Sequence, residues 1–196
     1  YDQMFSLLKD YYSSAIELNS DYYTKRKYTK GLDESLATHM ALAFAHLGMD
    51  FDDPLFVQFW KKQNITRHKE FISFIGRSCL TREDAGDEWF KKNKVEKEKL
   101  IKFWNWALEN VNPEALSVFG YWVNPKKEVL PDDVVIDNLE KTIKKTDGDI
   151  DWDYGFLERL PSFAVKNKKA TLEIIYSFLL NREGNLNQHR RVPFFA

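Results

Sequence analysis

Apolar residues recur at helical spacing along almost the whole of this 196-residue chain. Almost no stretch alternates between apolar and polar side chains with the period of two that a half-buried strand shows, whereas spacings of three and four are common. The sequence therefore predicts an all-α fold of many short helices. Its length is enough for one domain with a substantial core.

Capping residues and prolines mark where the expected helices begin and end. Asp33 is the expected N-cap of a helix that Gly48 ends, and Pro54 opens the next, because proline fits the first turn. Asn112 followed by Pro113 predicts another start of the same kind. Further helices are expected over residues 2–18, 66–80, 95–110, 152–165 and 168–180 and after Pro131, with a polar loop containing one helical turn at 81–94.

The sequence also resembles itself at an offset of 44 residues, and residues 160–164 form a weaker third copy. In two copies an aromatic pair lies in a helix that is followed directly by another helix carrying two small residues. The matching positions, which we expect to pack neighbouring helices, are Phe59, Trp60, Ser73, Gly76, Phe103, Trp104, Ser117 and Gly120. The small residues are expected to let the second helix of a pair approach its partner closely.

A period of about 40–47 residues built from two helices is typical of HEAT and armadillo repeats. In such arrays each helix pair buries its apolar faces against the neighbouring pairs. We therefore expect stacked helix pairs in a HEAT-like α-solenoid, with an irregular helical bundle as the alternative. The first residue is Tyr1, and the end is apolar, so residues 1–196 are expected to be one helical-repeat domain of a longer protein.

Two pairs of stretches carry a family resemblance. They are 100–106 (LIKFWNW) with 116–122 (LSVFGYW), and 150–153 (IDWD) with 157–160 (LERL). Residues 100–180 thereby resemble the helical C-terminal region of large multidomain bacterial proteins, some of which carry a P-loop NTPase or other effector domain, including anti-phage defence proteins. The resemblance implies a region that senses or holds a partner while the chemistry lies elsewhere, and it carries no catalytic residue.

The charge balance disfavours a dedicated nucleic-acid-binding domain, because 29 Lys and Arg residues against 30 Asp and Glu residues give a net charge of −1. One local segment keeps that function open. It interleaves tyrosines with the cations Lys25, Arg26, Lys27 and Lys30, as a surface that binds phosphates and stacks on bases does. A solvated loop between helices is the favoured interpretation.

An acidic stretch between two expected helices has carboxylates at positions 1, 3, 5 and 12 of an EF-hand-like calcium loop, namely Asp147, Asp149, Asp151 and Glu158. An EF-hand needs glycine at position 6, where this chain has Trp152. A turn whose aspartates cap the next helix is therefore favoured. No metal ion or other cofactor is expected.

No other pattern predicts catalysis. Cys79 is the single cysteine, so an internal disulfide is excluded and a reduced, cytoplasmic setting is favoured. Its side chain is expected to be a small buried apolar group. His39 and His46 are seven residues apart, too far to share a zinc ion, and His68 and His189 belong to no motif. Phosphate-binding glycine loops and hydrolase motifs are absent from the sequence.

The sequence thus predicts a non-enzymatic scaffold or recognition segment of a larger cytoplasmic bacterial protein, with no membrane contact. Its partner would be another protein or an adjoining effector domain, bound by shape. An exposed aromatic patch is where such a partner would dock, although aromatic side chains also serve as spacers between helices. An accessory nucleic-acid-binding helical domain is the alternative function.

Overall fold

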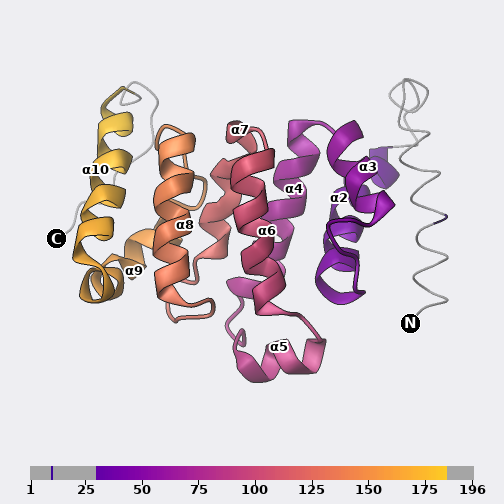
Figure 1. Cartoon of the computed structure of the whole chain (residues 1–196), viewed down its shortest axis with the longest axis horizontal. Helices are drawn as coiled ribbons and strands as arrows, with labels where there is room; N and C mark the ends of the chain where they lie inside the picture. Colours follow the sequence, from indigo (N-terminus) through magenta and orange to yellow (C-terminus); the bar gives the residue numbers. More distant parts are fainter. Residues whose placement is uncertain (1–9, 11–29, 185–196) are drawn as a thin grey trace.

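Helices make up all the regular secondary structure of the described residues, so the all-α prediction is confirmed (Figure 1). This computed structural model describes Asp10 and residues 30–184. In chain order the elements are α2 (Lys30–His46), α3 (Pro54–Lys62), α4 (Ile65–Ile75), the π-helical turn η1 (Gly76–Leu80), α5 (Asp87–Asn93), α6 (Lys97–Asn110), α7 (Pro113–Leu116), the 3₁₀ segment η2 (Ser117–Trp122), α8 (Asp132–Lys145), α9 (Asp153–Lys166) and α10 (Lys168–Gly184).

The elements follow one another along the long axis of the described part, from α2 and α3 at one end to α10 at the other (Figure 1). One series of contacts joins α2 to α4, α4 to η2 and η2 to α9. A second series joins α6 to α8 and α8 to α10. Helix α5 lies below the rest, in the connection between η1 and α6.

Side-chain caps fix several helix starts, as the sequence predicts. The carboxylate of Asp53 accepts a hydrogen bond of 2.9 Å from the backbone N–H of Leu55, directly before Pro54. The amide oxygen of Asn112 accepts one of 2.9 Å from the N–H of Glu114. Gly48 adopts φ +80°, the left-handed conformation expected just beyond the end of α2. These boundaries follow from local chemistry.

Other boundaries differ from the prediction. Helix α2 begins at Lys30 rather than after Asp33, because no proline interrupts the helix there and one glycine costs a helix only about 1 kcal/mol. Helix α4 begins at Ile65, one residue earlier than expected, since Asn64 is its N-cap. The helix expected over 66–80 is α-helical only to Ile75 and ends as the π-helical turn η1. The helix expected after Asn112 is α-helical for one turn and then becomes the 3₁₀ segment η2.

Close approach between segments explains η1 and η2. A Cβ atom on Gly76 would lie 2.6 Å from the backbone oxygen of Tyr121, and one on Gly120 would lie 1.9 Å from that of Asp151. The atoms nearest to Gly76 thus belong to η2, and those nearest to Gly120 belong to residues 150–151, rather than to the other helix of the expected pair. Ser117 bonds to the same loop before α9, through a hydroxyl that donates to Asp151 Oδ2 at 3.0 Å, whereas the Ser73 hydroxyl donates to the carbonyl of Glu70 within α4.

Trp122 and Asn124, at and just after the end of η2, donate to backbone carbonyls of the α4–η1 segment. The indole N–H of Trp122 donates to the carbonyl of Ile72 at 2.9 Å, and the amide of Asn124 donates to that of Leu80 at 2.8 Å. Leu80 is the last residue of η1, whereas Ile72 lies in the last turn of α4, where its carbonyl also accepts from the N–H of Gly76. Polar backbone groups at this junction are thus satisfied by the next segment of the chain.

Aromatic side chains fill the core. The ring of Phe103 lies 5.3 Å from that of Phe44, 5.5 Å from that of Phe71 and 5.8 Å from that of Trp122, so α2, α4, α6 and η2 meet around it. Trp104 is fully buried and stacks on Phe119 at 4.8 Å with an interplanar angle of 2°. Of the first repeated pair, Phe59 is buried, whereas Trp60 is only partly buried.

Adding a side chain at Gly120 is expected to lower the free energy of unfolding by about 1–3 kcal/mol or more, because a Cβ there overlaps backbone that cannot move aside cheaply. Gly120→Ser tests this in urea unfolding followed by circular dichroism. Gly86→Ser is the matched control, since a Cβ on Gly86 meets nothing within 4 Å and serine suits an N-cap. Equal stability of the two variants would contradict the close approach.

Candidate binding groove

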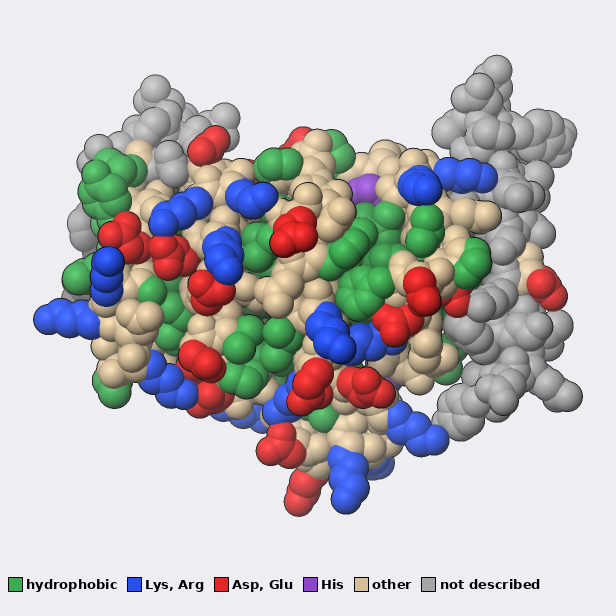
Figure 2. Space-filling model, in the orientation of Figure 1, with side chains coloured by type: hydrophobic (Ala, Val, Ile, Leu, Met, Phe, Trp, Pro, Cys, Tyr) green, Lys and Arg blue, Asp and Glu red, His purple; other side chains and the backbone are tan. Residues whose placement is uncertain are grey.

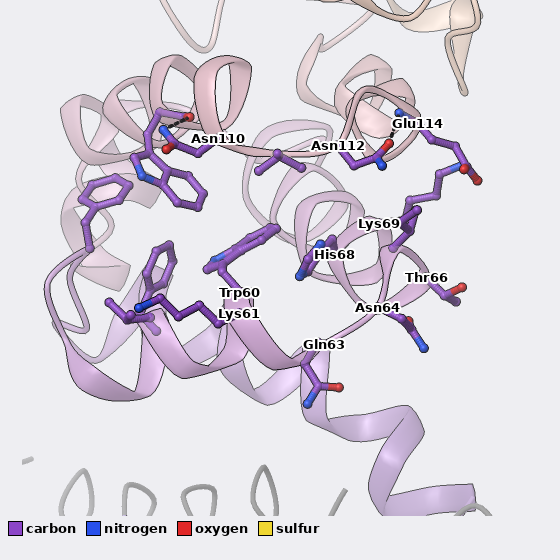
Figure 3. A pocket seen from close by; sticks show the side chains of 16 residues that line it. Trp60, Lys61, Gln63, Asn64, Thr66, His68, Lys69, Asn110, Asn112 and Glu114 are labelled. Atoms are coloured by element: carbon purple, nitrogen blue, oxygen red, sulfur yellow. Dashed lines mark hydrogen bonds and ion pairs between the residues drawn. The ribbon is translucent and has the colours of Figure 1, made fainter. Parts of the chain in front are cut away.

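A cavity of about 900 Å³ opens between α3, the first turns of α4 and the connection from α6 to α7 (Figure 3). Figure 2 shows hydrophobic side chains gathered on the surface between α3 and α6. We call this cavity the groove. Its apolar lining consists of Phe51, Phe56, Val57, Trp60, Trp106 and Val111, together with Ile65.

Aromatic rings hold α3 apart from α6 and form the inner walls of the groove. The Trp106 ring lies 5.4 Å from that of Phe56 and 5.3 Å from that of Trp60, and both pairs meet edge to face. In Figure 3 the side chains of Gln63 and Thr66 point away from Trp60. The inner surface is therefore aromatic, and the polar groups lie at its rim.

His68 and Trp60 lie side by side in the groove, with ring centroids 4.1 Å apart. Burial lowers the pKa of His68 to about 4, against the opposing effect of the backbone of Phe59 and Trp60, so its imidazole is neutral at pH 7. His68 Nε2 and Trp60 Nε1 are buried without a hydrogen-bond partner among the described residues. Each unsatisfied group of this kind costs about 1–3 kcal/mol.

The rim carries two lysines and one glutamate. Lys61 is exposed, and Lys69 lies 3.8 Å from the carboxylate of Glu114 across the groove (Figure 3). The amide of Asn110 donates to the carbonyl of Trp106 at 2.8 Å. The charged side chains of the groove thus leave a small positive excess beside an apolar interior.

The groove is a site that the sequence analysis does not predict. Trp60 is singled out there only as a packing residue, and His68 belongs to no motif. A signal does exist, because polar amides mark the ends of both helices that carry the repeated aromatic pair. Gln63 and Asn64 follow α3, Asn110 is the last residue of α6, and Asn112 follows it. The spacing of these turns in the sequence does not show how close they lie in the folded structure.

The acidic loop does not gather ligands for calcium. Among Asp10 and residues 30–184, no group of three or more His, Cys, Asp or Glu side chains could hold a metal ion. Asp147 and Asp149 are exposed, Asp151 accepts from the Ser117 hydroxyl, and Glu158 lies exposed on α9. Trp152 supplies the left-handed turn of position 6 with φ +60°, but α9 begins at the next residue and carries Glu158 along the helix.

The structure describes only some of the other residues that the sequence analysis names. Lys25, Arg26, Lys27 and His189 lie outside the described residues, and Lys30 is the first residue of α2. His39 is exposed, and His46 Nδ1 lies 3.2 Å from the carbonyl oxygen of Asn93. Cys79 is fully buried, and this burial raises the pKa of its thiol, which disfavours the reactive thiolate.

Within the part that the structure describes, none of the helices is both long and apolar enough to span a bilayer. Comparison of the chain with family models, curated proteins and solved structures found no match.

Proposed function

We propose that this chain is a HEAT-like recognition segment that binds a protein partner in the groove. Two series of helix contacts running along the same axis support a stacked arrangement, and so does the offset of 44 residues in the sequence. The proposal is for binding without catalysis, in a larger cytoplasmic bacterial protein. An accompanying effector domain would supply any chemistry.

The observation that carries this proposal is an open cavity with aromatic walls on the surface. Exposed apolar surface of this kind costs free energy unless a partner covers it. Peptide grooves commonly combine an apolar interior for one or two anchor side chains with polar groups at the rim. The groove has both, with Trp60 and Trp106 as its walls.

The charges at the rim select the partner. Lys61 and Lys69 outnumber Glu114, so a segment with acidic residues on both sides of its anchor is favoured. The anchor itself is expected to be a large apolar or aromatic side chain. Nothing in the described part of the chain pairs with the buried ring nitrogens Trp60 Nε1 and His68 Nε2, and a bound segment that shifts these rings gains by supplying partners.

Three acetylated, amidated hexapeptides test the proposal by isothermal titration calorimetry at low salt. EDLWED is expected to bind at least about fivefold more tightly than EDAAED, because removing an anchor costs more than about 1 kcal/mol. KRLWKR, which has the opposite charge, is expected to bind more weakly than EDLWED. Lys61→Glu should weaken the binding of EDLWED by about three- to tenfold.

Lys62→Glu is the matched control, because Lys62 is the exposed neighbour of Lys61 but does not line the groove. Equal effects of the two reversals would show that only the overall charge matters. Equal binding of EDLWED and EDAAED would exclude an anchor in the groove. Tight, salt-dependent binding of a DNA oligonucleotide instead would favour the nucleic-acid alternative.

A further inference from the structure

A second aromatic surface lies outside the groove, where η1, η2 and the start of α9 meet. The guanidinium carbon of Arg77 lies 5.4 Å from the centre of the Tyr121 ring. Tyr121 stacks on Trp152 at 5.4 Å with an interplanar angle of 20°, and Tyr154 meets Trp152 edge to face at 6.1 Å and 80°. We call Tyr121, Trp152 and Tyr154 the aromatic stack.

The outer end of the aromatic stack faces solvent. Trp152 is 44% exposed and Tyr154 is 53% exposed, and both are among the most exposed large apolar side chains described. Their rings stand nearly perpendicular and form two walls of a corner. The stack begins with the exposed guanidinium of Arg77 packed on the half-buried ring of Tyr121 and ends with the exposed rings of Trp152 and Tyr154.

The charge around this corner favours a cation. Residues 147–158 include Asp147, Asp149, Asp151, Asp153 and Glu158 and contain no Lys, Arg or His. Asp149 and Glu158 are exposed, and Glu158 follows Tyr154 by one helical turn. The next basic residue along the chain, Arg159, is buried against Asp132. Arg77 is the cation that packs on Tyr121 at the other end of the stack, and its single positive charge is outnumbered by the carboxylates of residues 147–158.

We propose that Trp152 and Tyr154 bind an arginine side chain of a partner peptide. Its guanidinium packs on the exposed rings as that of Arg77 packs on Tyr121, and the carboxylates of Asp149 and Glu158 supply the opposite charge. Arginine is favoured over lysine because its planar, weakly hydrated cation stacks on aromatic faces. Phosphates of a nucleic acid are disfavoured by the same carboxylates. This site is separate from the groove.

The backbone at Trp152 allows a clean test. Its φ of +60° lies in the left-handed region, which glycine adopts without steric strain and a bulky side chain does not. Trp152→Gly therefore removes the ring and suits the backbone. We expect this variant to keep the folded circular dichroism spectrum and to lose binding.

The probes are acetylated, amidated octapeptides, (GR)4 and (GK)4, with an eight-nucleotide oligothymidine as the third. Binding is measured by isothermal titration calorimetry, which does not depend on the ring that Trp152→Gly removes, and the shifts of tryptophan indole N–H signals in NMR spectra locate the site. We expect (GR)4 to bind about fivefold more tightly than (GK)4, to weaken as salt rises and to shift the Trp152 signal. Trp152→Gly should weaken (GR)4 binding by about fivefold or more.

Tyr176→Ser on α10 is the matched control, because Tyr176 is also an exposed aromatic residue and lies more than 20 residues along the chain from Tyr154. This variant should leave (GR)4 binding unchanged. If Trp152→Gly fails to fold, Tyr154→Ser replaces it, with the same expected loss. Equal binding of (GR)4 and (GK)4, binding that survives loss of the ring, or tighter binding of the oligothymidine at this surface would each overturn the proposal. Lys61→Glu should not weaken (GR)4 binding, which separates this site from the groove.

Discussion

Replacing Trp104 with alanine is expected to lower the free energy of unfolding by about 3–5 kcal/mol, the usual loss for a fully buried tryptophan. Its ring stacks on Phe119 at 4.8 Å, and its indole N–H donates to the hydroxyl of Thr142 on α8 at 3.0 Å. The variant thus creates a large cavity and removes a contact that joins α6, η2 and α8. Urea unfolding followed by circular dichroism at 222 nm measures the loss.

Trp104→Phe separates the two contributions. It retains most of the apolar volume and removes only the hydrogen bond, while the Thr142 hydroxyl still donates to the carbonyl of Asn138 at 2.7 Å. We expect this variant to lose less than half as much stability as Trp104→Ala. A loss below about 1 kcal/mol for Trp104→Ala would mean that this side chain is not in the core.

Removing Asp132 is expected to cost about 3–5 kcal/mol, because it leaves a buried guanidinium without its counter-charge. Arg159 Nη2 donates to Asp132 Oδ1 at 2.5 Å, and the two side chains are 8% and 5% exposed. Lys166 lies 3.6 Å from the other carboxylate oxygen. Asp132→Ala therefore leaves Arg159 and Lys166, two cations on α9, without the α8 carboxylate that both contact, and urea unfolding reports the loss.

The double variant Asp132→Leu with Arg159→Met is the control. Apolar side chains of similar size commonly replace a buried ion pair at little cost, so the double variant should recover most of the stability. Raising the salt concentration should change Asp132→Ala only slightly, since buried charges are poorly screened. A double variant as unstable as the single one would show that packing, and not the unpaired charge, dominates.

Local signals predict most of the helix boundaries. Asp53 with Pro54, Asn112 with Pro113 and the left-handed Gly48 each act within one turn of the chain, and the structure has all three. The winding of η1 and η2 has a different origin. It depends on how closely Gly76 and Gly120 approach other segments, and those distances arise only on folding.

The candidate sites also differ in whether they depend on local sequence or on contacts that form only on folding. The acidic loop attracts attention because its ligands are close in sequence, yet α9 carries Glu158 away from the aspartates. The groove goes unpredicted because Trp60 and Trp106 belong to different helices and meet through tertiary packing. Trp152 fails the glycine rule of the calcium loop, although its backbone adopts the conformation that glycine would.

The bonds that Trp122 and Asn124 make to the carbonyls of Ile72 and Leu80 bear on cooperativity. A chain cut between α4 and α7 would leave those acceptors to water and an aromatic surface uncovered. Neither half would then retain the stability it has in the intact chain. The described helices should accordingly unfold cooperatively, in a single thermal transition, because the contacts at this junction stabilise both halves.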